Sequence, residues 1–206
     1  MAAQRPTCDG PPSAGWLTSH LVARLQAAAT RLRFLLAVPA AALLFIFSDR
    51  GPIWPGAAIA LAGESLQVWA SAHLHKNTAL IQSGPYAWVR NPMYLGRFLV
   101  GLGLVLLTWR WFFILPYIAV FCLYAQARVL GEEARLQALF GEQYQAYSRA
   151  VGRWLPRPPR AALAGGRWSW ASVVRNHQLR VSVALLGWLA LIWWRARALG
   201  PAPRGW

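Results

Sequence analysis

The chain has 206 residues, of which 57% are hydrophobic and only 13% are charged. A soluble domain usually carries about 25% charged residues, so the composition argues against an ordinary soluble protein. The formal net charge is +15, yet the arginines flank apolar runs and no aromatic–basic motif for RNA or DNA occurs, so we expect no nucleic-acid partner. These features predict an all-α membrane protein with basic cytoplasmic surfaces.

The N-terminal region has two parts. Residues 1–15 are rich in Pro and Gly and predict a flexible tail. They contain no short apolar core followed by a small-residue cleavage site, so we expect no removable signal peptide. From Trp16 onward, leucines recur at nearly helical spacing with arginines off that face, which predicts an amphipathic entry helix on the membrane surface.

Apolar stretches further along the chain predict a bundle of four or five transmembrane helices. A crossing takes roughly 20 residues, so the first stretch is short unless its flanks contribute. The fifth stretch is just long enough to span if its flanking residues snorkel. The predicted helices cover residues 34–48, 53–73, 93–108, 111–127 and 181–194.

The predicted domain organisation follows these helices. Residues 16–156 form the membrane domain, with a loop at 78–94 and cytoplasmic helices at 128–152. Residues 157–206 form a basic, Trp-rich linker and a last apolar helix. We expect the helix that leaves the membrane after the hairpin to end near Gly141, with a second amphipathic helix after it.

The arginines predict the orientation of the bundle. Most basic residues, including Arg90 and the run from Arg128 to Arg180, fall on one side, whereas the opposite turns hold only Arg50 and Arg110. The positive-inside rule places the richer side in the cytoplasm. The arginine-dominated composition suggests a GC-rich bacterial genome, so we expect a bacterial inner membrane protein. If residues 181–194 span, Arg195 and Arg197 break this pattern.

Two polar regions are predicted to meet at the cytoplasmic side. The loop around "SGPYAWVRNPMYLG" (residues 83–96) returns at once to apolar sequence, and a helix beyond the hairpin carries Arg128 and Glu132 four residues apart. Irregular backbone at membrane depth is tolerated where protein or a wet cavity covers it. We therefore expect the loop and the helix to wall a cavity that faces the cytoplasm.

The two motifs together resemble a known family. The first has the spacing Gly-x-Tyr, Arg-x-Pro-x-Tyr-x-Gly, and the second is "ARVLGEEARLQALFGEQYQAYSRAVGRWLP". Over about residues 63–156 the chain resembles the isoprenylcysteine carboxyl methyltransferases and related phospholipid methyltransferases. This resemblance implies S-adenosylmethionine as cofactor and a lipophilic or lipid-modified methyl acceptor. It also implies that the protein is surrounded by membrane lipids.

The resemblance also implies the roles of individual residues. Arg128 and Glu132 match positions near the methyl acceptor. Asn91 stands where the family commonly has His, and Asn cannot titrate near neutral pH, so a base role there is not expected. The cofactor contacts implied are Thr78, Ala79, Leu80, Ile81, Tyr86, Asn91, Pro92, Met93 and Tyr94.

Residue chemistry adds two further candidates and leaves three questions open. Arg90 could bind the carboxylate of the cofactor or brace the loop, and Glu132 or Glu133 could bind the ammonium group of the cofactor. Glu64 is either a structural residue or a substrate contact. The acceptor is alternatively a phospholipid amine or a small thiol, and the chain is alternatively a non-catalytic scaffold or transporter. No metal site is expected, because Cys8 and Cys122 are far apart and the histidines lack a third ligand.

Overall fold

The structure, a computed structural model, describes residues 42, 44–48, 52–74, 80–158 and 168–198. The predicted tail, the entry helix, most of the first apolar stretch, Thr78 and Ala79 lie outside the described residues. The described part is helical, and its β-type pairing is limited to one isolated bridge between Val89 and Gly152.

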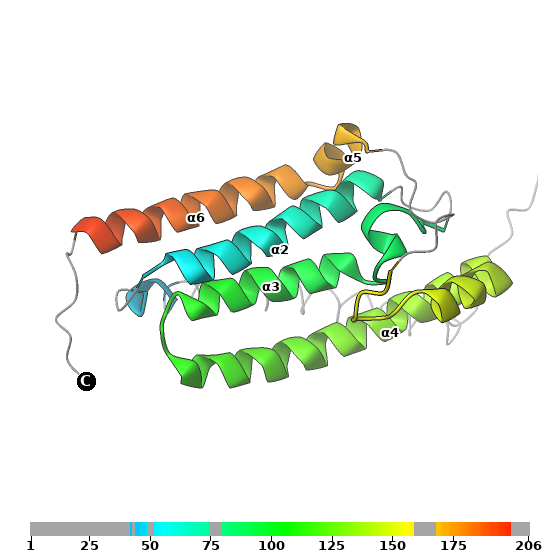
Figure 1. Ribbon diagram of the computed structural model, residues 1–206, viewed down its shortest axis with the longest axis horizontal. Coiled ribbons are helices and arrows are strands. Elements are labelled where there is room, and N and C mark those ends of the chain that lie inside the picture. Colours follow the sequence, from blue (N-terminus) through cyan, green and yellow to red (C-terminus); the bar gives the residue numbers. More distant parts are fainter. Residues whose placement is uncertain (1–41, 43, 49–51, 75–79, 159–167, 199–206) are drawn as a thin grey trace, which may run out of the picture. The chain divides into compact units, whose positions relative to one another are not determined.

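Four long helices lie side by side in the order α6, α2, α3, α4 (Figure 1). The helices predicted at 53–73, 93–108, 111–127 and 181–194 are confirmed, the last one longer than expected. Part of the predicted linker folds as the short helix α5. The elements are α2 (Trp54–His73), the 3₁₀ turn η1 (Gly84–Ala87), α3 (Pro92–Leu106), α4 (Trp111–Ala150), α5 (Trp170–Arg175) and α6 (Gln178–Ala198).

Glycines bring α2 and α3 into close contact. A Cβ added at Gly63 would lie 2.6 Å from the carbonyl oxygen of Gly96, and one added at Gly56 would lie 2.6 Å from that of Gly103. The two pairs are seven residues apart on each helix, so they lie on one face. Small residues of this kind allow helix backbones to approach closely where apolar burial alone gives little driving force.

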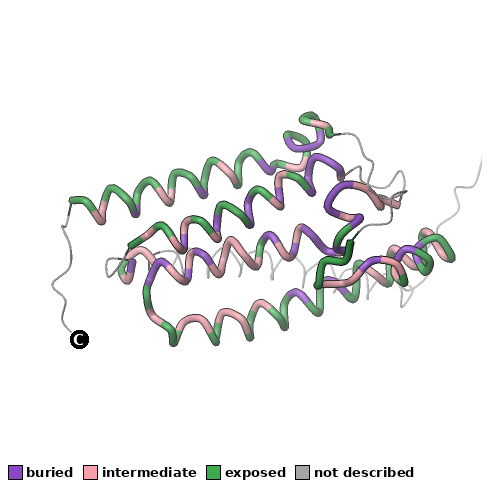
Figure 2. The backbone as a smooth tube through the Cα atoms, in the orientation of Figure 1, coloured by how far each residue is buried: buried purple, intermediate pink, exposed green. Residues whose placement is uncertain are grey.

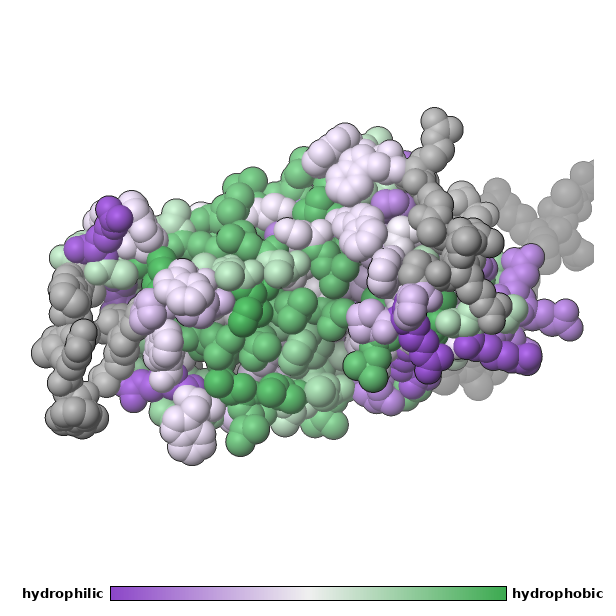
Figure 3. All heavy atoms as spheres, viewed as in Figure 1, coloured by the Kyte–Doolittle hydropathy of each residue, from purple (hydrophilic) through white to green (hydrophobic). Residues whose placement is uncertain are grey.

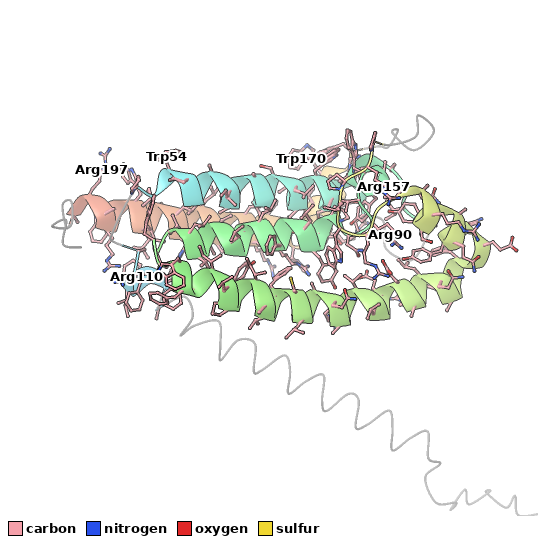
Figure 4. All side chains as sticks on the ribbon, turned by 60° about the horizontal axis from the view of Figure 1, so that its bottom comes forward. Trp54, Arg90, Arg110, Arg157, Trp170 and Arg197 are labelled. Atoms are coloured by element: carbon pink, nitrogen blue, oxygen red, sulfur yellow. The ribbon has the colours of Figure 1, made fainter. Side chains whose placement is uncertain are left out.

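The long helix α4 changes direction at Gly141. This residue has φ 50° and ψ −121°, a backbone conformation that glycine adopts without steric cost. The predicted end of the helix near Gly141 is therefore confirmed, and the helical residues after it turn back toward α3 (Figure 4). The chain then pairs with the predicted loop, where the Arg90 amide donates to the Gly152 carbonyl at 2.8 Å.

Polar contacts fix α6 against α2. The buried carboxylate of Glu64 accepts hydrogen bonds from Gln178 at 2.8 Å, from Ser182 at 2.5 Å and from Gln67 at 3.2 Å. All three donors are neutral, and none of the ion pairs among the described residues involves Glu64. The structure favours the structural role for Glu64, because its hydrogen bonds join two helices.

Two of the described helices, α4 and α6, are long and apolar enough to cross a membrane, which is fewer than the four or five spans expected. The helix α3 has only 15 residues, and α2 carries Glu64, Gln67 and further polar side chains that lower its hydropathy. Exposed residues cover much of α4 and α6 (Figure 2), and the hydrophobic ones lie over the middle of the bundle (Figure 3). Such a large exposed apolar surface indicates a membrane protein.

Candidate functional site

A cavity of about 490 Å³ lies at the end of the bundle where η1, the start of α3 and the second half of α4 meet. Arg90 lies at this end, whereas Arg110 and Arg197 lie at the opposite one (Figure 4). The wall combines aromatic, cationic and acidic side chains. It consists of Leu74, Leu80, Ile81, Tyr86, Arg90, Asn91, Pro92, Met93, Tyr94, Arg97, Arg128, Glu132, Glu133, Arg135, Leu136, Leu139, Phe140, Tyr144, Tyr147 and Asn176.

The loop wall of the cavity is built around Gly84 and Pro92. Gly84 has φ 59°, and a Cβ there would lie 2.6 Å from the ring of His73, so both conformation and space require glycine. Pro92 begins α3, where a missing N–H costs nothing. The Tyr147 hydroxyl donates to the Tyr86 carbonyl oxygen at 2.8 Å, which ties this loop to the segment after the α4 bend.

Glu133 joins the loop to α4 and to the segment that follows α4. Arg153 donates to both of its carboxylate oxygens, at 3.1 and 2.6 Å, and Arg90 lies 3.3 Å from one of them. Asn91 also donates weakly to Glu133, at 3.5 Å, and to the Arg153 carbonyl oxygen, at 3.4 Å. Both carboxylate oxygens of Glu133 already bind guanidinium groups. Glu133 therefore holds these segments of the cavity wall in place.

Tyr94 and Glu132 lie in contact on the cavity wall. The Tyr94 hydroxyl lies 3.5 Å from a carboxylate oxygen of Glu132. Arg128 is one turn before Glu132 on α4 and lines the same cavity, whereas Arg97 lies with its guanidinium carbon 5.3 Å from the Tyr94 ring centroid. The structure thus brings together the two motifs that are separated by the helical hairpin.

Tyr86 presents a neutral hydroxyl at physiological pH. Burial raises the pKa of Tyr86 well above its usual range, and the carboxylate of Glu132 raises it further, whereas Arg97 lowers it. A phenol of this kind donates hydrogen bonds but does not act as a base near neutral pH.

All predicted site residues within the described part of the chain line this one cavity. Arg90 pairs with Glu133, so the brace considered for Arg90 is observed, and Glu133 is engaged by protein cations. Six further residues contribute to the site although their part in it was not predicted from the sequence: Arg97, Arg135, Arg153, Tyr144, Tyr147 and Asn176. The spacing of Tyr144 and Tyr147 on one helical face was the available signal for those two.

Among the described residues, no group of three or more His, Cys, Asp or Glu lies close enough to hold a metal ion. His73 is engaged structurally instead. Its Nδ1 lies 3.0 Å from the Trp69 carbonyl oxygen, and its ring packs edge-on against Trp168 at 6.2 Å between centroids. Both contacts hold the His73 ring in place at the C-terminal end of α2.

The fold and this cavity describe a helical membrane protein with a polar, aromatic site at one end of the bundle. Residues 57–143 match the model of the phospholipid methyltransferase family. The chain is 31% identical over 102 residues to a protein-S-isoprenylcysteine O-methyltransferase of Schizosaccharomyces pombe, covering 50% of this chain and 43% of that one. It is 28% identical over 106 residues to the enzyme of that name in Tribolium castaneum, covering 52% of this chain and 38% of that one. The chain thus spans less than half the length of these curated relatives.

Proposed function

We propose that the chain is an integral membrane methyltransferase that moves a methyl group from S-adenosylmethionine to a lipophilic acceptor of the isoprenylcysteine carboxylate kind. The observation that carries the proposal is that Tyr94 and Glu132 meet in one cavity, most of whose wall lies within residues 57–143. Its volume falls within the range of about 300–1,000 Å³ that is usual for small-molecule sites.

The wall fits the chemical groups of this cofactor. Tyr86, Tyr144 and Phe140 supply aromatic faces for an adenine ring or a sulfonium. Arg90 lines the wall, and its buried Nε–H has no acceptor among the described residues, so a ligand carboxylate at this wall suits its chemistry. Glu132 is the carboxylate available for an ammonium group, because Glu133 is held by Arg90 and Arg153.

When bound, S-adenosylmethionine supplies an electrophilic methyl group on a positively charged sulfur. The task of the protein is then to align the acceptor and exclude water, which does not require a general base. Arg128 and Glu132 orient the acceptor beside Tyr94, and the η1 loop and the segment after Gly141, joined by the Tyr147–Tyr86 hydrogen bond, cover one side of the cavity. Asn91 contributes to this enclosure through its bonds to Glu133 and Arg153.

We further propose that the bundle crosses a bacterial inner membrane four or five times, with the cavity at the cytoplasmic side. Support comes from the basic residues at the cavity end and from the apolar surfaces of α3, α4 and α6. A lipophilic acceptor then reaches the cavity sideways from the bilayer, between helices.

Calorimetry on the purified protein tests the cofactor site. We expect binding of S-adenosylmethionine or its demethylated product, weakened about tenfold or more by Tyr94→Ala or Glu132→Ala. Glu142→Ala is the matched control, because Glu142 is exposed on the same helix and does not line the cavity. Failure of the unmodified, folded protein to bind either compound would contradict the proposal.

A second acceptor class is a phospholipid amine, which the family of residues 57–143 favours. Transfer of a labelled methyl group to a lipid extract distinguishes a carboxylate acceptor from an amine acceptor. Mild base releases the label from a methyl ester but not from an N-methyl group.

A further inference from the structure

We propose that Arg97 is a specificity-determining residue that, together with Arg128, binds an anionic group on the methyl acceptor. The inference rests on the proposed function for the site, and it assigns a role to a residue of α3 that neither sequence motif identified.

Arg97 stands out first by its position in α3. It is the sole charged residue of α3, whose sequence is PMYLGRFLVGLGLVL. An arginine in an apolar membrane helix is costly unless it reaches water, an interface or a cavity, and such residues usually have a function. Arg97 lines the cavity rather than a purely apolar surface, with its guanidinium 5.3 Å from the centre of the Tyr94 ring.

Arg128 approaches the same tyrosine from α4. It precedes Glu132 by one helical turn and also lines the cavity. Tyr94 therefore lies against two guanidinium groups from different helices, and the Glu132 carboxylate lies 3.5 Å from its hydroxyl. An acceptor group placed beside Tyr94 meets both cations.

The charges of the cavity wall leave these cations available. Four arginines and two glutamates line it: Arg90, Arg97, Arg128, Arg135, Glu132 and Glu133. Glu133 is shared by Arg90 and Arg153, and within the described part of the chain neither Arg97 nor Arg128 forms an ion pair with a carboxylate. S-adenosylmethionine carries one carboxylate against an ammonium and a sulfonium, so its binding adds positive charge.

An anionic acceptor group balances this excess, whereas an ammonium group beside the same residues is repelled. A carboxylate fits two guanidinium groups through charge-assisted hydrogen bonds. A phosphate diester of a phospholipid offers the same anionic oxygens. The chemistry recognised is thus an anionic oxygen group on an amphiphile, and a neutral thiol lacks it.

Binding measurements in lipid nanodiscs test this directly, with and without S-adenosylmethionine. The probes are an N-acylated S-prenyl-cysteine and its carboxamide, which has the same chain without the charge. We expect the carboxylate to bind about tenfold or more tightly than the carboxamide, and Arg97→Gln to abolish that preference. Arg97→Lys should restore part of it, and Arg149→Gln, which removes an exposed charge outside the cavity, should leave it unchanged.

Kinetics provide the second readout. In Arg97→Gln we expect a KM for the anionic acceptor raised about tenfold, with kcat and cofactor affinity nearly unchanged. If phosphatidylethanolamine is the acceptor instead, the same rise in its KM identifies phosphate as the anionic group. An unchanged KM for the methylated acceptor in Arg97→Gln would overturn the inference even where cofactor binding is normal. Where the prenylcysteine is that acceptor, equal binding of its carboxylate and carboxamide would overturn it too. Absence of cofactor binding by the unmodified protein contradicts the proposed function instead.

Discussion

At the scale of single residues, Glu133 holds three segments of the chain together. Its side chain is 11% exposed and pairs with Arg90 and Arg153. In Glu133→Gln both arginines lose their ion-pair partner, and hydrogen bonds to charged groups are worth about 1.5–3 kcal/mol. We expect a free energy of unfolding lower by about 2 kcal/mol, measured as a fall in Tm in detergent. Glu142→Gln removes an exposed charge on the same helix, and an equal fall in that variant would contradict the role given to Glu133.

At the scale of elements, the α2–α3 contact depends on two glycine pairs. In Gly63→Ala the new methyl group would lie 2.6 Å from the Gly96 carbonyl oxygen, a backbone atom that moves only with its helix. Overpacking of this kind costs about 1–3 kcal/mol. We expect a lower Tm and, because α3 carries Tyr94, weaker cofactor binding.

Gly187→Ala in α6 is the matched control for Gly63→Ala. No atom lies within 4 Å of a Cβ placed at Gly187, and alanine favours a helix over glycine. This variant should therefore be neutral or slightly stabilised. A loss of stability in Gly187→Ala as large as in Gly63→Ala would show that helix-to-helix distance is not the cause.

The sequence predicted the helices well because apolar runs, prolines and Gly141 mark them locally. The predicted loop and α4 residues meet in one cavity because the short α3–α4 hairpin returns the chain to the side it left. Arg153 was missed as the partner of Glu133, since a pairing over 20 residues depends on the bend at Gly141. Asn176 was missed because it reaches the cavity only after α5 docks on α2, where its amide donates to the Ser71 carbonyl oxygen at 3.3 Å.

At the scale of the whole molecule, α6 explains an exception to the predicted charge pattern. Arg195 lies at the end of the bundle opposite the cavity, where few basic residues were expected. Its guanidinium donates to the carbonyl oxygens of Phe45 and Ile46 and lies 4.5 Å from the centre of the Phe45 ring. Arg195 therefore makes a structural contact at that end, so it does not argue against the proposed orientation, in which the basic residues around the cavity face the cytoplasm.

Cysteine labelling in spheroplasts tests this orientation. In a chain without Cys8 and Cys122, a cysteine is introduced at Arg149 beyond the α4 bend or at Arg197 near the end of α6, both exposed positions. If the cavity faces the cytoplasm, a membrane-impermeant maleimide added to intact spheroplasts should label Arg197→Cys and leave Arg149→Cys unlabelled until the membrane is opened. The reverse pattern would place the cavity outside, away from the cytoplasmic supply of S-adenosylmethionine. Labelling of both positions in intact spheroplasts would mean that the two ends of the helix bundle do not lie on opposite sides of the membrane.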